Sequence, residues 1–355
     1  MSDFLIKRDD LRSCRTVDSE TPEIEAGQAL LRVDTFGLTS NNVTYAVFGE
    51  AMSYWRFFPA PEGWGRLPVW GFAEVERSEA EGVEPGARVY GYLPVSTHLV
   101  VTPEVVGRGS FVDASPHRAE LPAAYQLYTL TAGDGLYRAE TEDLQMLLRP
   151  LFATAFLIDD QLADEGLADR GPILISSASS KTAIAVAYLL AQREEAEVVG
   201  LTSSRNLDLV ESLDLYDRCV DYDDIGSLER EPASYVDIAG DAGVRLAVHS
   251  QFRDELAVSM AVGLTHWEEP AAGQGELPGP PPTLFFAPDR MRKRASDWGT
   301  ESLLERIAEA WHPFCDWAGG WLEVTSGQGF DAVESAYREV LDGRVQPKTA
   351  HVLSL

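Results

Sequence analysis

The pattern of apolar and polar positions divides the chain into two parts. In the first part, apolar and polar residues alternate in short runs, which is typical of half-buried β-strands. Such runs predict strands at 28–38, 69–75, 87–92 and 98–102, with glycine turns at Gly82, Gly86 and Gly91. Residues 1–105 are therefore predicted to form a mostly β domain.

In the second part, short apolar runs alternate with longer stretches of helical periodicity. A helix with an apolar stripe is predicted to begin at Arg149-Pro150. The strands that follow are predicted at 173–175, 197–201, 219–222, 235–239, 257–262 and 284–287, with helices at 182–192 and 207–213. Helical connections of this kind require a parallel, doubly wound sheet.

The remaining segments carry weaker patterns. Residues 107–148 are rich in turns and predict an irregular excursion, with a short helix at 140–148 at most. A Gly- and Pro-rich loop is predicted at 273–282. The chain is then predicted to close with helices near 301–311 and 331–341 and strands near 322–325 and 350–353.

Composition and charge narrow the classes of function. With 355 residues, 45% of them hydrophobic and 24% charged, the chain is long enough for two globular domains. The net charge of −28, with 25 Arg and 4 Lys, repels nucleic acid and anionic membranes. Three features favour a soluble cytoplasmic protein. The N-terminus is charged, no long apolar run occurs, and the three cysteines are scattered without a C-x-x-C pair. We therefore expect a small-molecule partner and neither a nucleic-acid nor a membrane partner.

The order of these parts resembles the medium-chain dehydrogenase/reductase superfamily, in its zinc-independent quinone oxidoreductase branch. Three segments, NNVTYAVFGE, YWRFFPAPEGWGRLPVWGFAEV and RPLFATAFLIDDQL followed by SSASSKTA, are similar to a bacterial family of unknown function. The resemblance implies an α/β protein with a GroES-like β-rich catalytic domain at 1–149 and 290–355. It also implies a Rossmann-type cofactor domain at 150–289, a cofactor in the cleft between the domains, and a homodimer.

The positions that bind zinc in other members of the superfamily hold different residues here. The G-H-E motif of zinc-dependent members corresponds to Gly71-Phe72-Ala73, and their cysteine falls in the segment Ser40-Asn41-Asn42. Phenylalanine and alanine cannot bind a metal, and no cluster of His, Cys, Asp or Glu replaces them. We therefore expect no metal.

A strand, a polar turn and a helix at 171–190 (GPILISSASSKTAIAVAYLL) form the candidate phosphate site. The superfamily has glycines at the positions of Ser177, Ser180 and Ala183. Serine and alanine are small enough for a somewhat wider approach, serine hydroxyls can donate to phosphate, and Lys181 at the helix start is favourable if an anion binds. The candidate contacts are Ser177, Ser179, Ser180, Lys181 and Thr182. A degenerate loop without a ligand is the alternative, and a P-loop is disfavoured because Ser180 precedes the lysine.

The end of the second predicted strand favours NADP(H) over NAD(H). An NAD-preferring site carries an acid there for the ribose 2′-OH, but this chain has Ser203-Ser204-Arg205 and no acid before Asp208. Hydroxyls and a guanidinium are suited to a 2′-phosphate. An ordinary polar loop with a solvated arginine is the alternative. The resemblance also implies that Tyr222 lies near the same end of the cofactor.

The resemblance supplies the candidate catalytic residues, because the pattern alone says little about catalysis. Asn42 and Tyr45 fall where quinone reductases place an Asn and a Tyr near the nicotinamide, with Asn41 as a rival for Asn42. Tyr45 could donate to a substrate carbonyl or protonate an enolate, or serve only in packing. Thr154 corresponds to a Thr near the nicotinamide amide, or only bonds within its own helix.

Two further segments stay open to two interpretations each. Residues 41–70 hold eight aromatic residues, which form either core packing or an apolar pocket wall for a planar or acyl substrate. The basic run 290–294 (RMRKR) is either a solvated helix face with domain-junction pairing or a site for an anionic substrate.

The hypothesis that joins these features is a metal-free, NADP(H)-dependent reductase. Its substrate would be a small apolar or aromatic compound with a conjugated carbonyl, such as an enone, an enal or a quinone. The alternatives are a lyase or isomerase on the same scaffold, and a non-catalytic protein that binds NADPH or a metabolite.

Overall fold

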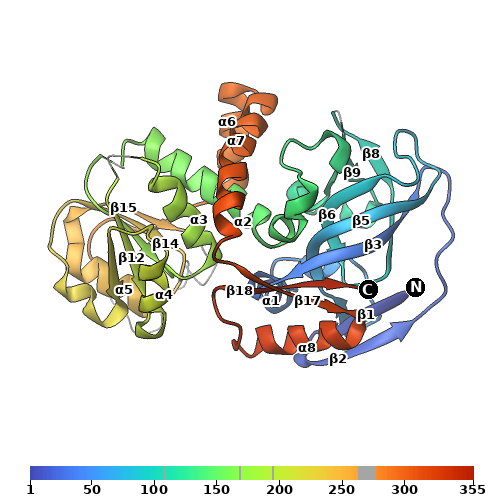
Figure 1. Cartoon of the computed structure of the whole chain (residues 1–355), viewed down its shortest axis with the longest axis horizontal. Helices are drawn as coiled ribbons and strands as arrows, with labels where there is room; N and C mark the ends of the chain where they lie inside the picture. Colours follow the sequence, from blue (N-terminus) through green and yellow to red (C-terminus); the bar gives the residue numbers. More distant parts are fainter. Residues whose placement is uncertain (108, 168, 194–195, 263–276) are drawn as a thin grey trace. The chain divides into compact units, whose positions relative to one another are not determined.

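The computed structural model describes residues 1–107, 109–167, 169–193, 196–262 and 277–355 (Figure 1). The chain forms two compact units. Unit 1 comprises residues 1–149 and 318–355, and unit 2 comprises residues 150–317. Residues 290–317, which the resemblance assigns to the first domain, are compact with the second unit.

Unit 1 is built on two β-sheets. The smaller sheet has the order β2 (Asp10–Asp18), β1 (Ser2–Lys7), β4 (Trp64–Arg66). The larger has the order β17 (Glu323–Gln328), β18 (Thr349–Ser354), β3 (Ala29–Leu38), β5 (Pro68–Ser78), β6 (Arg88–Pro94), β10 (Leu127–Leu130), β9 (Ser110–Asp113), β8 (Pro103–Val105), with β7 (His98–Val101) paired to β3. The larger sheet is antiparallel apart from the parallel pair β17–β18.

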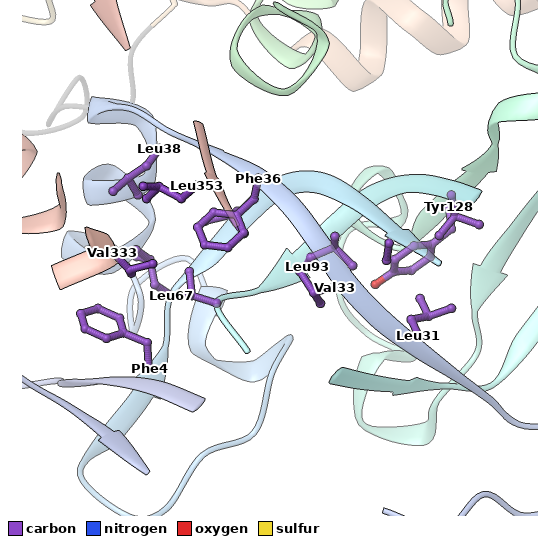
Figure 2. Close-up of a cluster of buried hydrophobic side chains, with 14 of the residues drawn as sticks. Phe4, Leu31, Val33, Phe36, Leu38, Leu67, Leu93, Tyr128, Val333 and Leu353 are labelled. Atoms are coloured by element: carbon purple, nitrogen blue, oxygen red, sulfur yellow. The ribbon is translucent and has the colours of Figure 1, made fainter. Parts of the chain in front are cut away.

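The core of unit 1 joins residues that are far apart in the sequence (Figure 2). Phe4 of β1, Phe36 of β3 and Val333 of α8 (Gly329–Leu341) are all fully buried in it. Burial of each such side chain contributes about 1.5–3 kcal/mol, so this core fixes α8 and β18 to the N-terminal strands. The Tyr337 hydroxyl on α8 donates to the Leu11 carbonyl (2.9 Å).

The predicted strands at 28–38, 69–75, 87–92 and 98–102 are confirmed, but two expectations for unit 1 are wrong and two strands were missed. The segment 107–148 is not an irregular excursion, because it supplies β9 and β10 to the larger sheet. Gly91 lies inside β6 and not in a turn. Glycine is needed there because a Cβ would lie 2.4 Å from the Tyr128 ring. The strands β1 and β2 were not predicted at all.

Helix α2 (Glu142–Asp164) begins earlier than Arg149-Pro150 and contains Pro150 in its interior. Proline has no N–H, so the carbonyl four residues earlier, on Met146, loses its helical partner. Gly37 of β3 packs against that carbonyl, because a Cβ on Gly37 would lie 3.0 Å from it. The sequence pattern places the helix start at this proline, whereas the helix continues through it and its Met146 carbonyl lies against Gly37 of β3.

Unit 2 contains a six-stranded parallel sheet, as predicted. Its order is β13 (Arg218–Asp221), β12 (Val198–Thr202), β11 (Ile173–Ser176), β14 (Ala233–Asp237), β15 (Leu256–Ala261), β16 (Thr283–Leu284). All pairs are parallel. The strand order reverses between β11 and β14, and in doubly wound sheets ligands bind at the carboxyl ends of the strands beside such a switch point.

The helices of unit 2 follow the predicted alternation. They are α3 (Lys181–Leu190), α4 (Leu207–Ser212), α5 (Ala242–Phe252), α6 (Ala287–Trp298) and α7 (Thr300–Ala318). The strand predicted at 284–287 ends at Leu284, because Pro288 lies in the first turn of α6. Of the loop predicted at 273–282, residues 273–276 lie outside the described part of the chain.

The basic run 290–294 lies on α6 and is largely occupied by carboxylates. Arg290 and Arg294 are buried, and both bond to Asp160 of α2, at 2.5 and 2.8 Å. Both also pair with Asp164 (2.9 and 2.8 Å), which holds the pKa of that carboxyl well below its usual range. These pairs explain why α6 is compact with unit 2.

Candidate functional site

The loop after β11 has a backbone shape that usually requires glycine. Ser177 lies in the left-handed region with φ = 55°. At this position the medium-chain dehydrogenase/reductase superfamily, which the sequence resembles, has glycine. For a residue with a Cβ this conformation costs about 1–2 kcal/mol. The loop thus keeps the shape of a glycine turn although the glycine is absent.

Replacing this serine tests the inferred strain. We expect Ser177→Gly to raise the free energy of unfolding by about 0.5–1 kcal/mol, since relief of the left-handed strain exceeds the entropy cost of glycine. The matched control is Ser179→Gly in the same loop, which has no positive φ. Its hydroxyl accepts a hydrogen bond, so we expect this change to be destabilising. Urea unfolding of both variants measures the difference, and an equal loss of stability in both would contradict the assignment of strain.

Side chains from three strand-to-helix loops converge at the carboxyl edge of the sheet. The Asn206 amide donates to the hydroxyls of Ser179 (3.0 Å) and Ser203 (3.4 Å). The Ser177 N–H donates to the hydroxyl of Tyr222 (2.9 Å), whose pKa is raised by burial. The structure therefore links Ser177, Ser179, Ser203 and Tyr222 of the predicted residues, from the first, second and third loops. Asn206, which makes two of these links, was missed.

A glycine in β12 allows the first loop to lie close to the second strand. A Cβ on Gly200 would lie 2.8 Å from the Tyr216 ring and 3.1 Å from the Ala178 methyl. The Ala178 N–H donates to the Leu201 carbonyl (3.1 Å), and the Tyr216 hydroxyl donates to the Ala178 carbonyl (2.8 Å). The glycine within a buried apolar run was the available signal, because it marks a close backbone approach.

The start of α3 combines hydrogen-bond donors with a cation. Ser180 is the N-cap, and its hydroxyl accepts from the Ala183 N–H (3.3 Å). Lys181 and Thr182 form the first turn, where the helix dipole is positive. Lys181 is partly buried, and burial lowers the pKa of its ammonium to about 8. Below that pH the side chain carries a positive charge at a helix start, which is suited to binding an anion.

The second loop presents its polar groups to solvent. Ser204 and Arg205 lie on a 3₁₀ turn (Ser204–Asn206) and are exposed, while Ser203 before them is partly exposed. An exposed guanidinium next to two serines in the sequence suits the charge and the acceptor oxygens of a phosphate monoester. The donor set of both loops therefore fits a dinucleotide with an additional 2′-phosphate.

A buried ion pair holds the turn at the switch point. Asp237 at the end of β14 pairs with Arg245 of α5 (2.7 Å), and both side chains are at least nine-tenths buried. The Ser176 hydroxyl donates to Asp237 (3.0 Å) and accepts the N–H groups of Ile238 and Ala239 (3.0 Å each). The turn after β14 is thereby tied to the end of β11. Sequence reasoning missed this cluster because a strand-ending Asp has several common roles.

In unit 1, Tyr45 lies in a cluster of aromatic side chains. Its ring packs against Tyr54 (4.8 Å between centroids), Tyr92 (5.4 Å) and Tyr125 (6.1 Å). We call Tyr45, Tyr54, Phe57, Trp70, Tyr92 and Tyr125 the aromatic cluster. Burial raises the pKa of Tyr45 well above its usual value, so its phenol is protonated at neutral pH. Tyr125 comes from the segment 107–148, where no site residue was predicted.

The other predicted catalytic residues differ in how their polar groups are engaged. The Asn42 side chain is buried, and it accepts from the Thr39 N–H (2.8 Å), which caps the start of α1 (Ser40–Val47). It also donates to the Pro68 carbonyl (3.0 Å). Its rival Asn41 contacts Tyr45. The Thr154 hydroxyl in unit 2 donates to the Pro150 carbonyl of its own helix (3.3 Å). The catalytic roles of Asn42, Tyr45 and Thr154 stay predictions.

The part of the chain that the structure describes holds neither a cluster of metal ligands nor a membrane-spanning helix. There, no three His, Cys, Asp or Glu side chains are grouped so that they could hold a metal ion. Over the same residues, no helix is both long enough and apolar enough to cross a membrane.

Comparisons with known proteins identify the fold and the family. The yhdH oxidoreductase from Salmonella enterica, solved in complex with NADP, is similar over 100% of both chains, with a TM-score of 0.60 and 16% identity. CurA from Vibrio vulnificus, solved with NADPH, is similar over 100% of this chain and 99% of that chain (TM-score 0.60, 14% identity). A quinone oxidoreductase from Coxiella burnetii is similar over 100% and 99% (TM-score 0.54, 13% identity).

These likenesses show a shared fold, the GroES-like plus Rossmann architecture of the medium-chain dehydrogenase/reductases. No curated protein matches the chain significantly in sequence. The model of a family described as a protein of unknown function, DUF2855, matches residues 36–346. The chain therefore belongs to the DUF2855 family, on a medium-chain dehydrogenase/reductase fold of the quinone oxidoreductase type.

Proposed function

We propose that this protein is a zinc-independent, NADP(H)-dependent reductase of conjugated carbonyl compounds. One observation carries the proposal: three loops of unit 2 converge at the carboxyl edge of the sheet, with Arg205 exposed beside Ser203 and Ser204. No acid stands at the end of β12, where an NAD-preferring site would have one. Proteins of the same fold crystallised with NADP and NADPH support the choice of cofactor.

The residues of unit 2 divide the proposed cofactor between them. The pyrophosphate would be held by Ser177, Ser179, Ser180, Lys181 and Thr182. The 2′-phosphate would be held by Ser203, Ser204 and Arg205. Tyr222 would lie beside the first loop. When bound, NADPH would supply a hydride. The N–H groups at the start of α3 and the Lys181 ammonium would neutralise phosphate charge on a protein whose net charge is −28.

The aromatic cluster of unit 1 supplies the proposed substrate-facing groups. Aromatic side chains next to a substrate would favour planar, apolar compounds such as enones, enals or quinones. Tyr45 is proposed to donate its hydroxyl proton to the substrate oxygen as negative charge develops there. Asn41 or Asn42 and Thr154 complete the predicted catalytic set.

Turnover assays test this proposal. We expect oxidation of NADPH in the presence of an enone or quinone, and a kcat/KM for NADPH about tenfold or more above that for NADH, because only NADPH offers a 2′-phosphate to Arg205. NADPH oxidation followed at 340 nm against a panel of enones, enals and quinones measures both. NADPH binding without oxidation of any member would favour the non-catalytic alternative. Conversion of a substrate without NADPH consumption would favour a lyase or isomerase.

A further inference from the structure

Tyr45 receives two N–H hydrogen bonds on its phenol oxygen. The Asn41 amide donates at 2.8 Å and the Trp70 indole Nε1–H donates at 3.1 Å. An indole N–H is a donor only, so the phenol oxygen must be the acceptor of the bond with Trp70. The hydroxyl hydrogen of Tyr45 takes no part in either bond.

The packing around these groups limits their movement. Tyr45 is 5% exposed, and its ring has three tyrosine rings within 6.1 Å between centroids. Trp70 lies on β5 and stacks on Tyr90, with the centroids 5.7 Å apart and the planes 18° apart. The phenol oxygen and the two N–H groups are therefore held at hydrogen-bond distance by side chains that are themselves packed.

The two donors also bear on the charge of the phenol. Burial raises the pKa of Tyr45, and the hydrogen bonds from Trp70 and Asn41 act against that rise because they stabilise the phenolate. A buried tyrosine without such donors is a poor acid. A buried tyrosine with two is better able to release its proton within the site.

We infer that Trp70 and Asn41 are positioning residues, whose N–H groups direct the Tyr45 hydrogen toward the substrate and stabilise the phenolate that its transfer leaves. This inference rests on the proposed function. In the step concerned, the Tyr45 O–H bond breaks and an O–H bond forms on the oxygen of the substrate enolate. The negative charge passes to the Tyr45 oxygen, and a proton from water restores the phenol. The resulting enol then rearranges to the saturated ketone.

A double-mutant cycle between Trp70 and Tyr45 tests the inference. Trp70→Phe keeps an aromatic ring against Tyr90 but removes the N–H, so we expect kcat to fall about tenfold, the effect of one hydrogen bond to a charged group. KM for NADPH should not change. In a Tyr45→Phe background the same change should have no further effect on kcat, since there is no phenol to orient. Trp64→Phe is the matched control, because Trp64 lies outside the aromatic cluster, and it should leave kcat unchanged.

Two further measurements separate positioning from loss of packing. Asn41→Asp is nearly isosteric but replaces the donor by an acceptor, which would take the Tyr45 hydrogen for itself, so kcat should fall further than in Asn41→Ala. The solvent deuterium isotope effect on kcat should rise in Trp70→Phe as proton transfer becomes slower. Independently of activity, the ¹⁵N-bound Nε1 proton resonance of Trp70 should shift in Tyr45→Phe.

The outcomes distinguish this inference from the proposed function. A wild-type protein that reduces no conjugated carbonyl would overturn both. A wild-type protein that turns over, combined with additive effects of Trp70→Phe and Tyr45→Phe or an unshifted Trp70 resonance, would overturn the positioning role alone. Non-additive effects with an unchanged KM for NADPH are the result we expect.

Discussion

Replacing Arg118 by methionine should destabilise unit 1 by about 3–5 kcal/mol, the cost of leaving a buried charge without its partner. Arg118 and Asp113 are both fully buried, and Nη1 lies 3.1 Å from the carboxylate. The guanidinium also donates to the Phe57 carbonyl (3.2 Å) and to the Tyr128 hydroxyl (3.2 Å). The midpoint of urea unfolding, followed by tryptophan fluorescence, measures the loss.

An exposed arginine from the same unit provides the control. Arg56 pairs with Glu120 at 3.6 Å, and more than half of its side chain is exposed. Exposed pairs of this kind contribute about 0–1 kcal/mol, so Arg56→Met should leave the unfolding midpoint nearly unchanged. Equal effects of the two substitutions would show that the Arg118–Asp113 pair does not carry the stability that its burial implies.

Replacing Arg205 by alanine should weaken NADPH binding about 10- to 100-fold, because a hydrogen bond to a charged group contributes about 1.5–3 kcal/mol. Affinity for NADH, which lacks the 2′-phosphate, should not change. Arg205→Lys should recover part of the loss, since it keeps the charge without the planar fork. Arg218→Ala on β13 is the matched control, because it removes an exposed arginine whose partner is Glu197 (3.3 Å).

Isothermal titration of the wild type and of the three variants with both dinucleotides provides the comparison. Loss of NADH affinity in Arg205→Ala equal to the loss of NADPH affinity would point to damage of the whole loop. An unchanged NADPH affinity would remove Arg205 from the proposed site.

The Rossmann-type sheet was predictable from the sequence because each strand is a short apolar run followed by a helical period. The run at 173–175 and the serines after it marked β11 and its loop, and both are where the pattern indicated. The proposed preference for a 2′-phosphate rests on the residue types at 203–205 and not on packing, so it could be stated from the sequence and stays a prediction. The pattern of apolar and polar residues is sufficient to predict those elements whose residues are close together in the sequence.

The rest depends on contacts between distant segments. Strands β9 and β10 were missed because their place depends on contacts with distant segments: each has only four residues and contributes one fully buried aromatic side chain, Phe111 or Tyr128, to the core of unit 1. The bond from Trp70 to Tyr45 was missed for the same reason, since residues 45 and 70 meet only after β5 has paired with its neighbours. The bond from Asn41 to Tyr45 spans one turn of α1, but its spacing alone does not show which polar side chain faces the phenol. Polar groups that are satisfied by distant partners leave no periodic signal in the sequence.

The central claim, an NADPH site in unit 2, is tested most directly by titrating the wild-type protein with NADPH and with NADH and following nucleotide fluorescence. We expect saturable binding of NADPH that is about tenfold or more tighter than that of NADH, because the loop carries an arginine and no acid. Equal affinity for the two nucleotides, or no binding of either, would contradict it.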